Sequence, residues 1–286
     1  MMKFALCTIS FRHQLISFPE IVNFARYHRF DGIEMWGIHA ENLFEHARLR
    51  TEFELRSMRS EGLSISMLSD YLSIALEQDF AATLHRCDRL IQLASWLGTT
   101  RIRTFAGQVP SQMLLPVERE RYVARLKKLC ERCKRFGIQL IVEIHPGTLA
   151  DSMDSTLNLL SEVGQEHLRL NFDVMHVWEF GGEIEEHYHK LKPWVDYFHL
   201  KNIREAQYVH IFEPSNVYAA SGNREGMSLL GEGIIDYKKF LDQLVDRDCY
   251  ASLEWFGSSP FKVLEKEITW LHQHQESMLA GQFGMH

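Results

Sequence analysis

The sequence predicts a single (β/α)₈ barrel that forms one α/β domain over residues 1–286. Short apolar runs alternate with longer amphipathic stretches, and this alternation is typical of a parallel sheet with covering helices. Eight such runs are present, in a chain close to the typical barrel length of about 250 residues. An open, doubly wound sheet is the alternative. It is disfavoured because no glycine-rich nucleotide loop follows the first run, where that fold often carries one.

The strands and helices are expected in strict alternation. The expected strands are Phe4–Ser10, Gly32–Trp36, Ser64–Ser69, Arg101–Phe105, Gln139–His145, Arg169–Asp173, Asp196–Lys201 and Ala251–Trp255. Amphipathic periodicity predicts helices at Phe18–His28, Phe80–Leu97, Glu118–Phe136, Ser155–Val163, Tyr237–Val245 and Phe261–His274. Gly98 and Gly137 stand where two of these helices should end.

One connection is unusually long for a compact domain. From about residue 203 to 233 the chain shows no clear periodicity, and it mixes aromatic residues, asparagines and Arg224. Loops of this length are usually functional or disordered. Because this one follows a strand with a polar end, we expect an active-site cover or a subunit contact.

Composition narrows the classes of function. The net charge of −7 argues against a nucleic-acid partner, which would favour a basic face. Five scattered cysteines indicate a reducing, cytoplasmic compartment, and Cys130 and Cys133 are expected to be ordinary helix residues because no second pair completes a zinc site. The apolar amino terminus is short and indicates a first strand, not a signal peptide. No run approaches the ~20 apolar residues of a membrane span.

Four strand-like runs end in residues that bind metals. They are Glu143, Asp173, His199 and Glu254, and they follow one another as consecutive ligand-bearing strands would. Buried charges are costly unless they are paired or bound to a metal, so packing alone does not explain all four. Three carboxylates and one imidazole suit Mn²⁺ or Mg²⁺, with Co²⁺ or Zn²⁺ able to substitute.

Further polar residues share the strand tops, where the active site of such a barrel lies. Side chains alternate along a strand, so His145 should face the barrel axis with Glu143, and Lys201 with His199. The same parity holds for Glu34 with Trp36 and for Arg101 with Arg103. His145 suits a general base and Lys201 a proton donor or anion partner. Arg103 is suited to bind a carboxylate group. His176 is placed either to orient a metal ligand or to contact the substrate, and Tyr71 is placed to line the mouth of the barrel.

These residues and several longer strings resemble the xylose-isomerase-like TIM barrels. More narrowly, the chain resembles the bacterial 3-dehydroshikimate dehydratases that supply 3,4-dihydroxybenzoate for petrobactin-type siderophores. The resemblance spans Phe4 to about Leu271. It rests on 7–18 (CTISFRHQLISF), 69–72 (SDYL), 102–108 (IRTFAGQ), 212–214 (FEP), 216–220 (NVYAA) and 251–257 (ASLEWFG).

The resemblance implies a reaction and a role for each candidate residue. A cation, most often manganese in such enzymes, would be bound by Glu143, Asp173, His199 and Glu254. His145 and Lys201 match the catalytic pair. The substrate positions are matched by Arg103, Tyr71, His176, Tyr218 and Phe212. The implied chemistry is removal of a ring proton beside the ketone of 3-dehydroshikimate, followed by loss of water and aromatisation.

Three other readings remain. A sugar or hydroxy-keto-acid isomerase or epimerase would use the same cation without losing water. A related DNA-repair endonuclease would need more metal ligands and a basic face, and a non-catalytic metal protein would not need His145 and Lys201. The sequence leaves open whether the product feeds siderophore synthesis or quinate and shikimate catabolism. We expect a small-molecule substrate, no membrane partner and a homodimer.

Overall fold

The computed structural model describes residues 1–244 and 247–283, and its parallel strands close into a barrel. The barrel strands are β1 (Lys3–Cys7), β2 (Gly32–Trp36), β3 (Ser64–Ser69), β4 (Arg101–Phe105), β5 (Gln139–Glu143), β6 (Leu168–Asp173), β7 (Val195–Leu200) and β10 (Tyr250–Leu253). Their order around the barrel is β1-β10-β7-β6-β5-β4-β3-β2, and β1 closes the ring by pairing with both β2 and β10. The (β/α)₈ barrel is therefore confirmed, and the open sheet is excluded.

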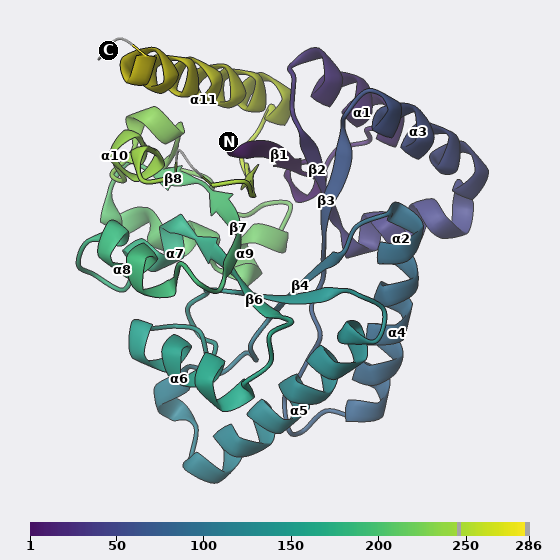
Figure 1. Cartoon of the computed structure of the whole chain (residues 1–286), viewed down its shortest axis with the longest axis vertical. Coiled ribbons are helices and arrows are strands. Elements are labelled where there is room, and N and C mark those ends of the chain that lie inside the picture. The colour runs from purple at the N-terminus through teal and green to yellow at the C-terminus, as the bar shows by residue number, and fades with distance from the viewer. Residues whose placement is uncertain (245–246, 284–286) are drawn as a thin grey trace.

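Helices lie around the outside of the strands (Figure 1). They are α1 (Phe18–Tyr27), α2 (Gly37–His46), α3 (Arg48–Ser60), α4 (Phe80–Leu97), α5 (Pro116–Lys134), α6 (Met153–Val163), α7 (Val174–Trp178), α8 (Ile184–Leu191), α9 (Pro214–Tyr218), α10 (Tyr237–Asp242) and α11 (Pro260–Phe283). The helix predicted over Tyr237–Val245 is shorter, and Val245 itself lies outside the described residues. Gly98 ends α4 in the left-handed conformation (φ 75°), as its position predicted.

The sequence did not predict α2, α3, α7, α8 or α9. In α3 only Thr51, Leu55 and Met58 are buried, so the apolar stripe that marks a covering helix is narrow. α7 is a single short turn whose start is fixed by the side chain of Asp173, which accepts from the backbone N–H groups of Met175 and His176.

The apolar core lies mainly between the outer face of the barrel and the helices, as expected for strands covered on that face. Inside the barrel, Met67, Ile141 and Tyr197 form a separate apolar layer. Tyr197 also shares a hydrogen bond with Ser66, across 2.7 Å. This layer fills the barrel below the polar residues at the strand ends, so the site has a packed floor.

The segment from 203 to 233 is more ordered than its lack of periodicity suggested. It contains a 3₁₀ helix η3 (Ala206–Phe212), α9 and a 3₁₀ helix η4 (Leu230–Glu232), while strand β8 (Asn202–Ile203) pairs antiparallel with β9 (Met227–Ser228). Arg12 donates from Nε to the carbonyl of Val217 across 2.7 Å. Arg224 donates from Nε to the carbonyl of Phe256 across 2.9 Å. These contacts fasten the segment over the carboxyl ends of β1 and β10.

The cysteines that the sequence singled out lie on α5. Cys130 and Cys133 are both buried residues of this helix. The thiol of Cys133 lies 3.8 Å from that of Cys87 on α4. Within the described residues, none of the helices is both long enough and apolar enough to cross a membrane.

Candidate active site

Glu143, Asp173, His199 and Glu254 converge at the carboxyl ends of four strands, and all four are buried. Asp173 and His199 are register partners on β6 and β7, while Glu143 ends β5 and Glu254 directly follows β10. Nδ1 of His199 lies 3.6 Å from Oε1 of Glu143, 3.7 Å from Oδ2 of Asp173 and 3.5 Å from Oε2 of Glu254. The structure thus brings together the four residues that the sequence singled out.

This cluster fits a divalent cation. Atoms bound about 2.1 Å from one ion lie about 3 to 4 Å from each other, which matches the separations around Nδ1 of His199. Among the described residues, this Nδ1 has no hydrogen-bond partner, although it is buried. Buried polar atoms are normally satisfied, so an unpaired nitrogen that faces three carboxylates indicates a binding position.

Two buried basic side chains, those of Lys201 and Arg103, offset the negative charge of the carboxylates. Nζ of Lys201 lies 2.5 Å from Oδ2 of Asp173 and 2.8 Å from Oε2 of Glu254. Nε of Arg103 lies 3.1 Å from Oε2 of Glu143. Burial opposes the charge of Lys201, but the carboxylates of Asp173 and Glu254 outweigh it and hold the lysine pKa well above its usual value. Lys201 is therefore an ammonium group, able to donate a proton or bind an anion.

His145 stands at the rim of the cluster with a neutral ring. Its Nδ1 lies 2.6 Å from the carbonyl oxygen of Pro146. Burial, together with the neighbouring His176, lowers the pKa of His145 to about 3. A carbonyl can only accept, so Nδ1 carries the proton and Nε2 keeps a lone pair. The ring presents an acceptor suited to a general base.

His176 packs beside His145 and lines the same cavity as Glu143 and Glu254. Its ring centre is 4.4 Å from that of His145, and its Nδ1 lies 2.6 Å from Oε1 of Glu179. Its Nε2 is 3.8 Å from Oδ2 of Asp173, too far for a hydrogen bond. Glu179, which sequence reasoning did not identify, therefore holds His176 in place.

A cavity of about 350 Å³ opens above the cluster. Of the eleven residues predicted for the site, nine line this cavity, while Asp173 and His199 are fully buried. The guanidinium carbon of Arg103 lies 4.9 Å from the ring centre of Tyr71, and Nη1 of Arg103 has no hydrogen-bond partner within the described part of the chain. Phe212 lies on the other side, with its ring centre 5.3 Å from Nζ of Lys201.

The long segment contributes part of this wall. Tyr218 on α9 packs 6.2 Å from Tyr71 and stacks parallel to Trp36 with ring centres 6.0 Å apart. Burial raises the pKa of both tyrosine hydroxyls, so both remain protonated donors. Phe212 and Tyr218 come from the segment for which we expected an active-site cover or a subunit contact.

Sequence reasoning missed several contributors. Glu34 was expected to face the axis but was given no role, and it lies 2.9 Å from Nε2 of His199. Phe105 and Phe256 also line the cavity, and each could have been found from its place beside a polar strand end. Arg101, which shares parity with Arg103, lies deeper in β4 and pairs with Asp196 across 2.5 Å.

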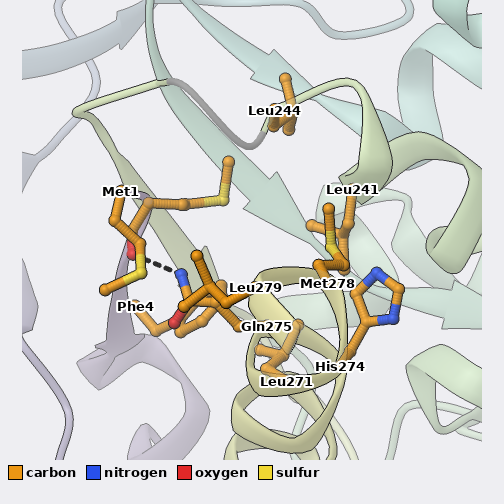
Figure 2. Close-up of a pocket in the computed structure, with 10 residues that line it drawn as sticks. Met1, Phe4, Leu241, Leu244, Leu271, His274, Gln275, Met278 and Leu279 are labelled. Carbon is orange, nitrogen blue, oxygen red and sulfur yellow. Dashed lines mark hydrogen bonds between the residues drawn. The ribbon is translucent and has the colours of Figure 1, made fainter. Parts of the chain in front are cut away.

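A second cavity lies beside the amino-terminal end of β1, between α10 and α11 (Figure 2). Its volume is about 580 Å³, and Phe4, Leu241 and Leu271 are among its mostly apolar lining residues. Nε2 of Gln275 donates to the carbonyl of Met2 across 3.1 Å at its edge. The chemistry-bearing side chains converge at the strand carboxyl ends, so we place the active site in the smaller cavity.

Comparisons with known proteins agree with this geometry. Residues 22–274 match the family model of the xylose isomerase-like TIM barrel. A 3-dehydroshikimate dehydratase from Bacillus anthracis is 47% identical over 267 residues, which cover 93% of this chain and 95% of the relative. The crystal structure of the probable 3-DHS dehydratase AsbF, involved in petrobactin synthesis in the same organism, matches with a TM-score of 0.94 and 46% identity. That match covers 95% of this chain and 99% of the other. An L-ribulose 3-epimerase shares the fold at 16% identity (TM-score 0.76, 99% and 97% covered).

Proposed function

The chain belongs to the xylose isomerase-like TIM barrel family, and from that premise we propose that it dehydrates 3-dehydroshikimate to 3,4-dihydroxybenzoate. The observation that carries this proposal is the 47% identity, over 93% of the chain, with a relative named for that reaction. The sites of many barrel enzymes differ, so the fold alone would not select a substrate. Here the likeness covers nearly the whole chain and is not confined to one part of the barrel.

The cation would be held by Glu143, Asp173, His199 and Glu254. Their mostly oxygen donors suit Mn²⁺ best, with Mg²⁺, Co²⁺ or Zn²⁺ as substitutes. When bound, the cation supplies Lewis-acid polarisation of the substrate ketone, which acidifies the adjacent C–H bond. This donor set, and the unpaired Nδ1 of His199 within it, support the assignment.

Arg103 binds the carboxylate of the substrate in this proposal. Its buried guanidinium has an unpaired Nη1 in the cavity, and guanidinium groups bind carboxylates in a bidentate manner. Tyr71 and Tyr218 close the same side with aromatic faces and hydroxyl donors, while Phe212 covers Lys201. The substrate ring is thereby held between Arg103, which binds its carboxylate, and the four residues that would hold the cation.

His145 removes the proton from C4, beside the ketone. Its Nε2 lone pair is free because Nδ1 donates to Pro146. The hydroxyl group leaves from C5 as water, and Lys201 donates the proton that this group needs. Loss of one proton from C6 and its return at the ketone oxygen complete the aromatic ring. The balance is one water lost for each product formed.

The proposal is tested by product mass. Purified enzyme is incubated with 3-dehydroshikimate and Mn²⁺, and the product is identified by mass spectrometry and by the ultraviolet absorbance of a catechol acid. A product lighter than the substrate by one water supports the dehydratase. An unchanged mass with altered chromatographic retention would instead support the isomerase, which the comparisons do not favour.

The setting of the reaction is also a proposal. We place the enzyme in the cytoplasm, because its five cysteines are all free. Supply of 3,4-dihydroxybenzoate to a siderophore is favoured over catabolism by the petrobactin role of the B. anthracis relative. We also expect a homodimer, which light scattering tests directly; a strictly monomeric mass would reject it.

A further inference from the structure

Glu34 is a buried carboxylate for which the proposed reaction has no use. It lies in β2 and is fully buried at the barrel axis. An ionised group in such a place is costly unless hydrogen bonds satisfy it. Oε2 of Glu34 lies 2.9 Å from Nε2 of His199, and the hydroxyl of Ser69 donates to Oε1. The contacts of Glu34 therefore lead straight to one proposed metal ligand.

These contacts determine which nitrogen of His199 carries a proton. An ionised carboxylate only accepts, so Nε2 of His199 must be the N–H donor. In the neutral ring the lone pair is then on Nδ1. Nδ1 is also the atom that faces Glu143, Asp173 and Glu254 at 3.5 to 3.7 Å. Glu34 thus favours the tautomer whose lone pair points at the cation position.

We propose that Glu34 is a positioning residue that fixes the tautomer and ring orientation of His199 for metal binding through Nδ1. The inference rests on the proposed metal-dependent function and deepens it. A carboxylate on the far nitrogen of a ligating histidine orients the ring and raises its basicity. Ser69, one strand further along the barrel, holds the carboxylate in turn.

A different use of Glu34 is less consistent with its contacts. Ligand atoms of Cys7, Glu34 and Glu254 lie within 4.8 Å of one another, so this trio is a conceivable second cation site. Nε2 of His199 lies 3.1 and 2.9 Å from the two oxygens of Glu34, and the hydroxyl of Ser69 also donates to Oε1. The carboxylate is therefore committed to the histidine.

Manganese affinity provides the first test. Free Mn²⁺ is followed by electron paramagnetic resonance during titration of metal-free wild type and Glu34→Gln, which preserves shape but removes the charge. Loss of such an outer partner typically weakens metal binding about 10- to 100-fold, and we expect a loss in this range. Glu267→Gln is the matched control. Glu267 is also a buried glutamate, but it accepts from the backbone N–H of Leu230 and is not among the residues that line the active-site cavity, so its replacement should leave the affinity unchanged.

A spectroscopic test separates positioning from general stability. Zinc-loaded protein labelled with ¹⁵N-histidine should show, for His199, a metal-shifted Nδ1 and a downfield Nε2–H proton hydrogen-bonded to a carboxylate. That proton signal should move or vanish in Glu34→Gln. Ser69→Ala removes one hydrogen bond to Glu34 and should weaken Mn²⁺ binding only a few-fold. This variant replaces Glu34→Gln as the test if Glu34→Gln does not fold.

The outcomes distinguish this inference from the proposed function. If wild type binds Mn²⁺ and both variants bind it equally well with an unchanged His199 spectrum, the positioning role is overturned and the metal site stands. If wild type binds neither Mn²⁺ nor Zn²⁺, the metal site and the inference both fail. Graded loss from wild type through Ser69→Ala to Glu34→Gln supports the proposal.

Discussion

Nδ1 of His145 lies 2.6 Å from the carbonyl oxygen of Pro146, the next residue in the chain. This local contact leaves Nε2 as the only acceptor on the ring, at the wall of the cavity. Within the described residues, the proposed base is thus prepared by its neighbour in sequence and not by a carboxylate partner, so its removal should not disturb the cation cluster.

We expect His145→Ala to lose turnover by about 100-fold or more, the usual contribution of a general base. Mn²⁺ affinity and the melting temperature should change little. Steady-state kinetics and a metal titration of the same preparation check both expectations. His39→Ala is the matched control, because His39 is a half-buried histidine whose pKa is likewise lowered by burial, to about 4, and it contacts Thr8 outside the cavity. Near-normal turnover of His145→Ala would remove His145 from the mechanism.

Arg103→Lys should raise KM for 3-dehydroshikimate by about 10-fold or more, with a smaller effect on kcat. A lysine keeps the charge beside Glu143 but cannot bind a carboxylate through two parallel N–H groups. Arg101→Lys is the natural comparison, since Arg101 lies on the same strand and pairs with Asp196 away from the cavity. Equal KM values in the two variants would show that Arg103 does not bind the substrate.

Arg224→Ala should loosen the wall that carries Tyr218. Arg224 donates from Nη2 to the carbonyls of Val217 and Ala219 at 3.1 and 3.0 Å, and from Nε to that of Phe256. We expect a higher KM and faster proteolysis within 213–224, with unchanged Mn²⁺ affinity. Arg132→Ala, which removes a surface pair with Asp88, controls for loss of charge. An unchanged KM and proteolysis rate in Arg224→Ala would rule out this fastening role.

Stability should depend on pH through Glu267. Burial raises the pKa of this carboxyl from 4.5 to about 8, so the folded protein retains a proton that the unfolded chain loses. The stability that this retained proton provides is fully present below pH 4.5 and is lost as the pH rises through about 8. Glu267→Gln should therefore gain stability relative to wild type over this interval, by one to a few kcal/mol, since each unit of pKa shift is worth about 1.4 kcal/mol. Urea unfolding at pH 5, 7 and 9 measures this; a constant difference would contradict it.

Much of the barrel was predictable because its elements are marked locally. β2, β3 and β4 begin and end where the sequence predicted, as does α4, which Gly98 terminates. The predicted strand that ended at His145 instead stops at Glu143, because the backbone N–H of His145 bonds to the carbonyl of Ala150 within the following loop. Such loop contacts have no periodic signal.

The site was predictable to the extent that topology alone brings its residues together. Parallel strands present their carboxyl ends at one face, so Glu143, Asp173, His199 and Glu254 had to converge once the barrel was inferred. The pairing of Glu34 with His199, 165 residues apart, depends on side-chain choices inside the closed barrel. The contact of Glu179 with His176 depends on α7, which is too short to carry a pattern.

The most direct test of the central claim is metal-dependent turnover. The protein is stripped with a chelator and supplied with 3-dehydroshikimate, and ultraviolet absorbance of the catechol acid is followed before and after addition of Mn²⁺. We predict negligible product without metal and restored product with Mn²⁺. Folded protein that forms no product with any of Mn²⁺, Mg²⁺, Co²⁺ or Zn²⁺ would contradict the account, as would full activity in the stripped enzyme.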